Sequence, residues 1–493
     1  MTREVTPPRL FERVRVVTIQ PPGYAHSAAF DDLVACLAAG FAALGAQVDT
    51  SVNQPLVGDG INILVGAHLI GPGYPLPDNC IVFNVEQIRS GRYAQPTHYL
   101  ELLKRFLVLD YSERNIEHIK QRTGNEQVYL CKVGTVPALS RIASATEQDV
   151  DVLFYGVVNE RRKAILDALV AAGLKLKVLT GVYGAERDKW IARSKVVLNL
   201  HFYDDHIHEI VRTSFLMANR KAVVSEIAHD TEIDDDIRQG IVAVPADAIV
   251  ETCKQLVRDD ARRRDIEQRA FETISRREQS AILAVLIPTL SKPIPTRINL
   301  GSGKAFDPSM LNIDLDAKWR PDILGDIAAH ARQIFLSRRF GLVRLENAAF
   351  DEITTNDVLE HIPDLVAMMT RCLDLLRIGG TMKIGVPYDL SWGAWQDPTH
   401  VRAFNERSWL YYTDWHWYLG WTQTRFDATE IKMNLSPLGE NLRRSGTARD
   451  EIFRTPRAVD SMDVVLTKRE LTQTERDNAL AWQRGEMKTK VKL

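Results

Sequence analysis

The sequence predicts an α/β protein made of three successive domains, each built on a largely parallel sheet. Short apolar segments alternate with amphipathic segments of helical periodicity from residue 14 onward. This alternation restarts after Gln148, and again after a proline-containing segment at 291–297. With 493 residues, the chain is also too long for a single hydrophobic core.

The first domain is expected over residues 1–145. An apolar strand at 14–19 is broken by Pro21-Pro22-Gly23, and apolar residues then recur at helical spacing up to Gly45, which ends the helix. Further strands are expected at 47–50, 61–65, 81–84 and 106–109. Because helices separate consecutive strands, the strands should be parallel.

The second domain is expected over 146–290, with the same alternation. Strands are predicted at 150–155, 176–179, 196–200, 222–225 and 242–244. Helices are predicted at 161–172, 188–194 and 209–218, followed by one long charged helix from about 247 to 277.

The third domain is expected over 298–468. The preceding segment, 291–297, contains Pro293 and Pro295 and is predicted to be a linker. The last strand of the domain is expected at 462–466. The polar segment 469–493 is predicted to be a surface helix or a tail.

Composition narrows the function classes. The 45% of apolar and 26% of charged residues are ordinary for a soluble globular protein, and the net charge of −2 argues against a nucleic-acid partner. Five scattered cysteines, without a CxxC pair, indicate a reducing compartment and no disulfide framework. No signal peptide or transmembrane segment is recognised, so we expect a cytoplasmic protein. Peripheral membrane association through a partner or a lipid-linked substrate stays open.

The most informative segment is the start of the third domain. Ile298-Asn299-Leu300 leads into Gly301-Ser302-Gly303, and a second apolar segment ends in Asp314. Glycines let the backbone approach a ligand closely, and a carboxylate after the next strand can accept the hydroxyls of a ribose. This pattern suits an adenosine-containing cofactor.

Three further segments follow in order. Asp326 ends a predicted strand, "DVLEHI" at 357–362 follows another, and "LRIGG…VP" spans 376–387. Together with the glycine turn, they resemble class I S-adenosylmethionine-dependent methyltransferases. The resemblance implies that Gly301, Ser302 and Gly303 approach the methionine of the cofactor, Asp314 binds the ribose, Asp326 and Ile327 flank the adenine, and Asn356 and Asp357 face the methionine and the acceptor. Lys304 and Ala305 follow Gly303, where the family often has a third glycine.

Methyl transfer to a hydroxyl needs an aligned acceptor and a group that takes its proton. His361 and His400 are candidate bases because imidazole titrates near neutral pH, and Asp357 is a third catalytic candidate. Structural roles for both histidines stay open. A metal held by Asp397, His400 and another carboxylate is an alternative, but we predict no metal. Six tryptophans between 392 and 421 are expected mainly to form a small core of their own, with one or two lining an acceptor cleft.

The second domain carries another motif set. Gly156 follows a strand and precedes two arginines, Glu209 and Arg212 begin a helix, and Glu226 ends a strand. This resembles the nucleotide-binding half of GT-B-type glycosyltransferases. The resemblance implies that Gly156 with Arg161 or Arg162 faces the diphosphate, Glu209 and Arg212 face the donor, and Glu226 contacts the ribose. In the first domain, His26 and Glu86 lie at strand ends and are candidate acceptor bases.

This second resemblance has departures. Glu209-Ile210-Val211-Arg212 stands in place of "EPFG", and Asn219-Arg220-Lys221 replaces a glycine turn. The predicted fold is therefore two Rossmann-like domains in a GT-B arrangement, followed by a class I methyltransferase Rossmann-like domain. The functional hypothesis is a glycosyltransferase that uses a nucleotide sugar, fused to a methyltransferase acting on a sugar hydroxyl of a glycan or glycoconjugate.

Three alternatives stay open. The methyltransferase alone could be active, with the first 290 residues a glycan- or nucleotide-binding module. The other two are modification of a nucleic-acid base and a non-enzymatic scaffold.

Overall fold

The computed structural model describes residues 4–5, 10–89, 95, 97–143, 147–202, 206–329 and 332–486. The chain forms two compact units. One spans Arg9–Leu290, and the other spans Ser291–Leu493 together with Met1–Pro8.

The first domain of the Arg9–Leu290 unit is built on a six-stranded parallel sheet, in the order β3-β2-β4-β5-β6-β7. The strands are β2 (Arg13–Thr18), β3 (Gln47–Val52), β4 (Ile61–Val65), β5 (Cys80–Phe83), β6 (Leu107–Asp110) and β7 (Val128–Leu130). The helices are α1 (Asp31–Ala43), α2 (His98–Arg105) and α3 (Glu113–Thr123). Every residue of β4, β5 and β6 is buried, as expected for central strands covered on both faces.

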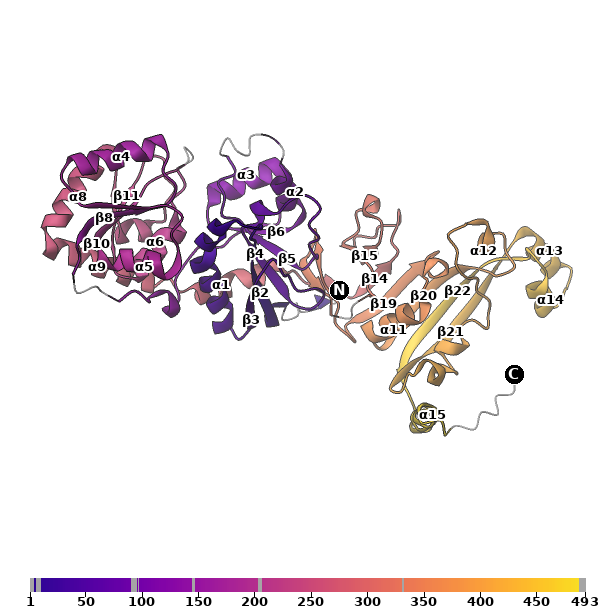
Figure 1. Cartoon of the computed structure of the whole chain (residues 1–493). Coiled ribbons are helices and arrows are strands. Elements are labelled where there is room, and N and C mark those ends of the chain that lie inside the picture. The colour runs from indigo at the N-terminus through magenta and orange to yellow at the C-terminus, as the bar shows by residue number, and fades with distance from the viewer. Residues whose placement is uncertain are drawn as a thin grey trace. The chain divides into compact units, whose positions relative to one another are not determined.

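The second domain has a five-stranded parallel sheet in the order β12-β11-β10-β8-β9. The strands are β8 (Val150–Tyr155), β9 (Leu176–Leu179), β10 (Ser194–Asn199), β11 (Ala222–Glu226) and β12 (Val242–Val244). The helices are α4 (Glu160–Ala171), α5 (Gly184–Arg193), α6 (Ile210–Ala218), α7 (Asp235–Gly240), α8 (Ile249–Arg258) and α9 (Asp260–Ser275). Figure 1 shows α4 and α8 on one face of this sheet and α5, α6 and α9 on the other.

The two sheets share one arrangement. In each, the first strand (β2 or β8) lies between the second and third strands, so the strand order reverses beside it. Open α/β sheets bind ligands at the carboxyl ends of the strands at such a reversal. Helix α10 (Gln279–Leu286) follows the second domain in sequence but packs on α1 of the first. The Gln279 amide oxygen accepts a hydrogen bond from the Gly134 N–H at 2.8 Å, which ties the domains into one unit.

The Ser291–Leu493 unit holds a seven-stranded sheet in the order β16-β15-β14-β19-β20-β22-β21. The strands are β14 (Arg297–Leu300), β15 (Leu311–Asp314), β16 (Ile323–Leu324), β19 (Phe350–Asn356), β20 (Leu376–Pro387), β21 (Thr424–Leu435) and β22 (Val459–Glu470). The first five in this order pair in parallel, whereas β22 runs antiparallel to both β20 and β21. Counted along the chain the order is 3-2-1-4-5-7-6, that of the class I methyltransferase fold, so the predicted fold class is confirmed.

Smaller elements complete this unit. They are the pair β17 (Ile334–Ser337) and β18 (Gly341–Arg344), the helix α11 (Leu365–Leu375), the short helices η9 (Leu359–His361), α12 (Gly393–Gln396), η10 (Leu410–Tyr412) and η11 (His416–Leu419), and the helices α13 (Pro437–Arg444), α14 (Arg449–Arg454) and α15 (Gln473–Gln483). Among the described residues, no helix is both long and apolar enough to cross a membrane.

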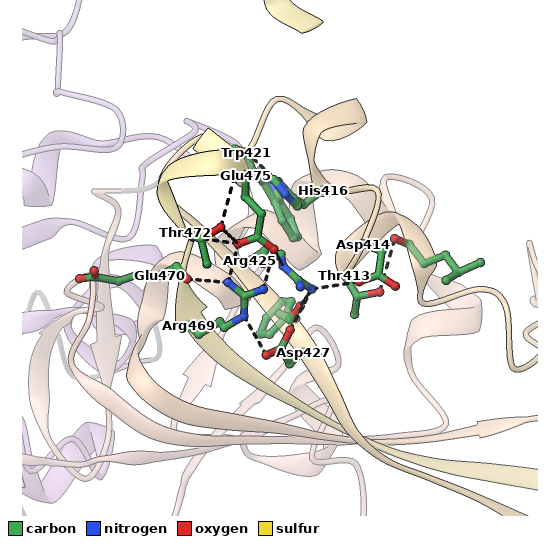
Figure 2. A network of polar contacts seen from close by, with 12 residues as sticks. Thr413, Asp414, His416, Trp421, Arg425, Asp427, Arg469, Glu470, Thr472 and Glu475 are labelled. Carbon is green, nitrogen blue, oxygen red and sulfur yellow. Dashed lines mark hydrogen bonds and ion pairs between the residues drawn. The ribbon is translucent and has the colours of Figure 1, made fainter. Parts of the chain in front are cut away.

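Helix α15 lies in the segment for which a surface helix or tail was predicted. Figure 2 shows Glu475, in its first turn, between Arg425 of β21 and Arg469 of β22. Glu475 is 3.0 Å from Arg425 and 2.7 Å from Arg469, and its side chain also accepts a hydrogen bond from the Thr472 N–H at 2.8 Å. These hydrogen bonds, first of all that from Arg469, hold the pKa of Glu475 well below its usual range.

Three expectations need correction. The predicted long helix is two helices, because the Asp259 side chain accepts a hydrogen bond from the Arg262 N–H and so starts α9 anew. The predicted linker contains β13 (Ile294–Pro295), which pairs antiparallel with β1 (Glu4–Val5). The tryptophan-rich segment forms no separate core: Trp409 and Trp421 belong to the main core of the unit.

Candidate functional sites

A cavity of about 540 Å³ lies within the Arg9–Leu290 unit. Its walls come largely from segments that follow strands, β2, β4, β5 and β6 in the first domain and β8, β9 and β10 in the second. Six residues singled out in the sequence line it: His26, Glu86, Gly156, Arg162, Glu209 and Arg212. The cavity therefore brings together residues from the carboxyl edges of two sheets that are up to 186 positions apart, the separation of His26 and Arg212.

On the second-domain side, one carboxylate pairs with two arginines. Glu209 is 2.9 Å from the Arg162 guanidinium and 2.5 Å from that of Arg212. Arg212 also donates to the Asn199 side-chain oxygen at 3.0 Å. Burial lowers the pKa of Arg162 to about 10, although Glu209 opposes that shift. The Glu209 side chain makes no capping hydrogen bond to α6, so its partners are the arginines rather than the helix.

Gly156 occupies the turn between β8 and these arginines. Its φ is +136°, and a Cβ there would lie 3.1 Å from the Arg212 Nη2. A side chain at this position would therefore press on the arginine. The backbone conformation favours glycine, and a Cβ would also move the end of the Arg212 side chain by a few tenths of an ångström.

The first-domain side of the cavity holds the two predicted acceptor bases. His26 Nδ1 lies 2.6 Å from the Tyr183 hydroxyl, so its Nε2 remains for another partner. The Glu86 carboxylate is 3.3 Å from the His68 Nε2. Neither His68 nor Tyr183 was among the site residues predicted from the sequence. Both residues follow predicted strands, which is the same feature that identified His26 and Glu86 as candidates.

Two further charges face the cavity in a pair. Asp32 binds Arg187 at 2.7 Å, and both residues line the wall. This pair was not predictable from the sequence, since each residue lies within an otherwise ordinary helix, α1 or α5. The remaining predicted donor-site residues, Arg161 and Glu226, do not line this cavity but pair with each other, with Arg161 Nη1 donating at 2.9 Å.

In the Ser291–Leu493 unit, the predicted cofactor residues gather at the carboxyl ends of β14, β15, β16 and β19. The Gly303 N–H donates to Asp314 Oδ2 at 2.8 Å, which joins the glycine turn to the end of β15. Gly301 has φ +67°, and a Cβ there would lie 2.3 Å from Val358 Cγ2. The loops after β14 and β19 therefore meet at the point where the strand order reverses.

The other predicted cofactor residues lie around this turn. Ser302 is 2% exposed, and its hydroxyl has no hydrogen-bond partner among the described residues. Asp326 accepts a hydrogen bond from the Ala328 N–H at 2.8 Å, and Ile327 is buried in the core. Asn356, at the end of β19, is exposed. An unpartnered buried hydroxyl in the turn is the kind of group that a bound ligand satisfies.

The candidate catalytic residues Asp357, His361 and His400 lie in the segments that follow β19 and β20. Asp357 has φ +54°, and its N–H donates to the Gly385 carbonyl at 2.9 Å. The rings of His361 and His400 contact edge to face, with centroids 4.6 Å apart. Glu360, which the sequence analysis quoted in its motif without a role, is 1% exposed, and burial raises the pKa of its carboxyl.

Exposed aromatic side chains flank these loops. Trp392 and Trp395 are 61% and 65% exposed, on either side of the start of α12. The Arg457 guanidinium lies over the Trp392 ring, 3.7 Å from its centroid, whereas the Trp395 indole N–H donates to the Asp389 carbonyl at 3.2 Å.

No family model matches the chain. It is similar to proteins of Acanthamoeba polyphaga mimivirus. It is 29% identical to "Uncharacterized protein L140" over 182 residues, covering 36% of this chain and 59% of the relative. It is 28% identical to "Uncharacterized protein L137" over 184 residues, covering 36% of this chain and 23% of the relative. The chain thus spans less than two thirds of either relative.

Three solved structures are similar at low identity. HepE of Anabaena in complex with UDP and glucose is 12% identical, with TM-score 0.40, 57% of this chain covered and 99% of that one. A glycosyltransferase of Rickettsia africae is 9% identical, with TM-score 0.37 and coverage of 56% and 97%. A SAM-dependent methyltransferase of Archaeoglobus fulgidus is 14% identical, with TM-score 0.26 and coverage of 38% and 91%. Similarity at this level does not indicate a shared activity.

Proposed function

We propose that the chain is an enzyme with two transferase activities, placed in the cytoplasm. The Arg9–Leu290 unit transfers a sugar from a nucleotide sugar to a glycan or glycoconjugate. The Ser291–Leu493 unit methylates a sugar hydroxyl of that glycan or a related one, with S-adenosylmethionine as donor. The observation that carries the proposal is the cavity that gathers His26, Glu86, Gly156, Arg162, Glu209 and Arg212 at the carboxyl ends of two parallel sheets.

The size and charge of this cavity suit a nucleotide sugar. Its 540 Å³ lie within the range of small-ligand sites. Arg162 and Arg212 can donate to diphosphate oxygens, and the absence of a side chain at Gly156 lets the donor approach the backbone. In the GT-B families that the second domain resembles, a glutamate at the start of the equivalent helix contacts the donor, a role open to Glu209.

The proposed sugar transfer needs a base on the first-domain side. An acceptor oxygen bonds to the anomeric carbon of the donor, and the bond from that carbon to the diphosphate breaks, leaving its electron pair on the phosphate oxygen. The acceptor proton passes to His26 Nε2 or to the Glu86 carboxylate, which both line the cavity. Tyr183 and His68, at 2.6 Å and 3.3 Å, orient these two groups.

Methyl transfer is assigned to the carboxyl edge of the third sheet. The turn at Gly301 and Gly303 and the Asp314 carboxylate suit the cofactor, and the loops after β19 and β20 suit the acceptor. The acceptor oxygen bonds to the methyl carbon while the carbon–sulfur bond breaks with its electron pair remaining on sulfur. The acceptor proton leaves to a group at this edge. Exposed Trp395 offers a face for stacking of the acceptor sugar.

One observation favours a second function, that of a methyltransferase with a binding module in front. Glu209 already pairs with both Arg162 and Arg212, which leaves the three side chains with a net charge of +1, and Asp32 pairs with Arg187. A diphosphate would have to compete with these carboxylates for the guanidinium groups. A neutral glycan would leave the pairs intact and use them as hydrogen-bonding groups.

A thermal-shift titration separates the two functions. The full chain would be titrated with S-adenosylhomocysteine and, separately, with UDP, GDP, ADP, CDP and dTDP, because a ligand selective for the folded state raises the melting temperature. Arg212→Ala and Glu209→Gln are the test variants, and Lys189→Ala, in an exposed pair on α5, is the control. The bifunctional proposal predicts that S-adenosylhomocysteine and one nucleotide stabilise the wild type, and that Arg212→Ala abolishes only the nucleotide effect.

Stabilisation by S-adenosylhomocysteine alone would reject sugar transfer and support the binding-module function. Stabilisation by none of these ligands would reject both.

A further inference from the structure

Three side chains with metal-ligand chemistry converge in the third domain, outside the cofactor turn. Glu360 and His361 are the last two residues of η9, the short helix that follows β19. His400 lies in the segment between β20 and β21. One potential ligand atom from each lies within 4.8 Å of the other two. The Val401 N–H donates to the Glu360 carbonyl at 2.9 Å, which fastens one loop to the other.

Neighbouring groups fix the tautomer of each histidine. The Thr399 hydroxyl donates to Asp397 Oδ1 at 2.7 Å, so it must accept at 2.9 Å from His361 Nδ1. The Ala394 carbonyl can only accept, so His400 Nδ1, at 2.9 Å, must carry its hydrogen. In the neutral rings, both Nε2 atoms therefore present a lone pair rather than a proton.

Glu360 adds a third electron-pair donor. The residue is 1% exposed, and neither carboxylate oxygen has a hydrogen-bond partner among the described residues. The His400 Nε2 lies 4.0 Å from Glu360 Oε1, beyond hydrogen-bonding distance. A buried carboxylate without partners is strongly unfavourable, and a cation bound among these three side chains would stabilise it.

We propose that Glu360 and the Nε2 atoms of His361 and His400 bind one divalent transition-metal ion. Two imidazoles and one carboxylate form a common ligand set for zinc and for non-haem iron, and it leaves coordination positions open. The Nδ1 atoms, which would not bind the metal, are held by hydrogen bonds: that of His361 by Thr399, itself bound to Asp397, and that of His400 by the Ala394 carbonyl. Metal-binding histidines usually have such a partner on their second nitrogen. This proposal differs from the sequence-based prediction of no metal. It also differs from the alternative site that included Asp397, because here the carboxylate ligand is Glu360.

The position of the ion gives it a role. It lies at the carboxyl ends of β19 and β20, beside the edge assigned to the methyl acceptor. An open coordination position there would bind the acceptor oxygen, orient it and lower the pKa of its hydroxyl. The site stands on the geometry of the three side chains, whereas this role rests on the proposed methyl transfer.

Metal content tests the site directly. The full chain would be stripped with a chelator, then dialysed separately against Zn²⁺, Mn²⁺, Fe²⁺ and Co²⁺, and bound metal measured by mass spectrometry. For Co²⁺, the visible absorption of the bound ion is a second readout. The test variants are Glu360→Gln, His400→Ala and Thr399→Val, and the controls are Glu430→Gln and His229→Ala, which change exposed residues of the same types.

We expect one ion per chain in the wild type and in both controls, and none in Glu360→Gln or His400→Ala. Thr399→Val should weaken binding by roughly 10- to 100-fold, because only the outer partner of His361 is lost. Misfolding is excluded by the metal-free melting temperature, which Glu360→Gln should leave unchanged or raise, since it removes an unpartnered buried charge. Metal should raise the melting temperature of the wild type but not of this variant.

Two outcomes overturn the proposal. One is a wild-type chain that retains none of the four ions and shows no thermal shift with any of them. The other is equal metal binding by the wild type, Glu360→Gln and His400→Ala. Thermal shifts with S-adenosylhomocysteine are recorded on the same samples. A chain that binds metal but not S-adenosylhomocysteine would contradict the proposed methyl transfer and keep the metal site.

Discussion

Replacing Gly301 with alanine tests the glycine turn, because two separable costs are expected at this position. The φ of +67° places an L-residue in the left-handed region, which costs about 1–2 kcal/mol. The new Cβ would also lie 2.3 Å from Val358 Cγ2, and overpacking of this kind costs about 1–3 kcal/mol. Gly301→Ala should therefore lower the free energy of unfolding of this unit by about 2–5 kcal/mol.

The second substitution, Val358→Ala, separates the two costs. Added to Gly301→Ala, it should recover the overpacking part and leave about 1–2 kcal/mol from the backbone. Gly303→Ala is the matched control, because its φ is also left-handed, at +47°, but its Cβ would have nothing nearer than 3.9 Å. Its cost should be only the backbone cost of about 1–2 kcal/mol, and Val358→Ala should not recover it.

Urea unfolding followed by tryptophan fluorescence measures these effects, since Trp190 is the only one of nine tryptophans outside the Ser291–Leu493 unit. Calorimetric titration with S-adenosylhomocysteine gives the second readout, and Gly301→Ala should weaken binding at least tenfold by displacing the loop after β19. Wild-type stability and affinity in Gly301→Ala would refute the described contact with Val358. Lost stability with unchanged affinity would refute the cofactor assignment alone.

The remaining predictions concern other parts of the chain. The depressed pKa of Glu475, caused chiefly by Arg469, means that its contribution to stability is present above the unfolded value of about 4.3 and is lost as pH falls toward the folded pKa. Glu475→Gln should thus flatten the fall in melting temperature as pH drops from about 5 to about 2; a parallel fall in both proteins would contradict this. Gly156→Ala should displace Arg212 and weaken nucleotide binding without changing S-adenosylhomocysteine binding, as calorimetry would show. Trp395→Ala should raise KM for the glycan acceptor and leave the cofactor affinity unchanged; unchanged KM would remove Trp395 from the acceptor site.

Much of the fold was predictable because strand and helix periodicities are local properties. Strand β5 consists of continuous apolar residues and β4 is apolar except for Asn62, and the glycines that end helices stand where the chain needs a left-handed residue. Residues at strand ends were predictable as site residues for a related reason. In each parallel sheet these ends meet at one edge, and residues from the edges of both sheets line the same cavity, among them His26 of the first domain and Gly156 of the second.

What the sequence did not reveal depends on contacts between distant segments. Glu360 stands beside a histidine in a motif that otherwise reads as a turn and helix start, where a glutamate is normally solvated. Its burial and its meeting with His400 depend on the loop near residue 400 folding back over it. The break between helices at Asp259 depends instead on a local contact. The charged residues on both sides favour helix, and only the capping hydrogen bond ends one helix and starts the next.

The central claim is that one chain both glycosylates and methylates a glycan. The most direct measurement is the mass of glycan products after incubation with S-adenosylmethionine and the nucleotide sugar whose nucleotide stabilises the chain. The account predicts products that gain both a sugar and a methyl group, with Arg212→Ala losing only the sugar and Gly301→Ala losing only the methyl. Methylated products that never gain a sugar, from a panel of glycan acceptors, would contradict it and leave the first 290 residues as a binding module.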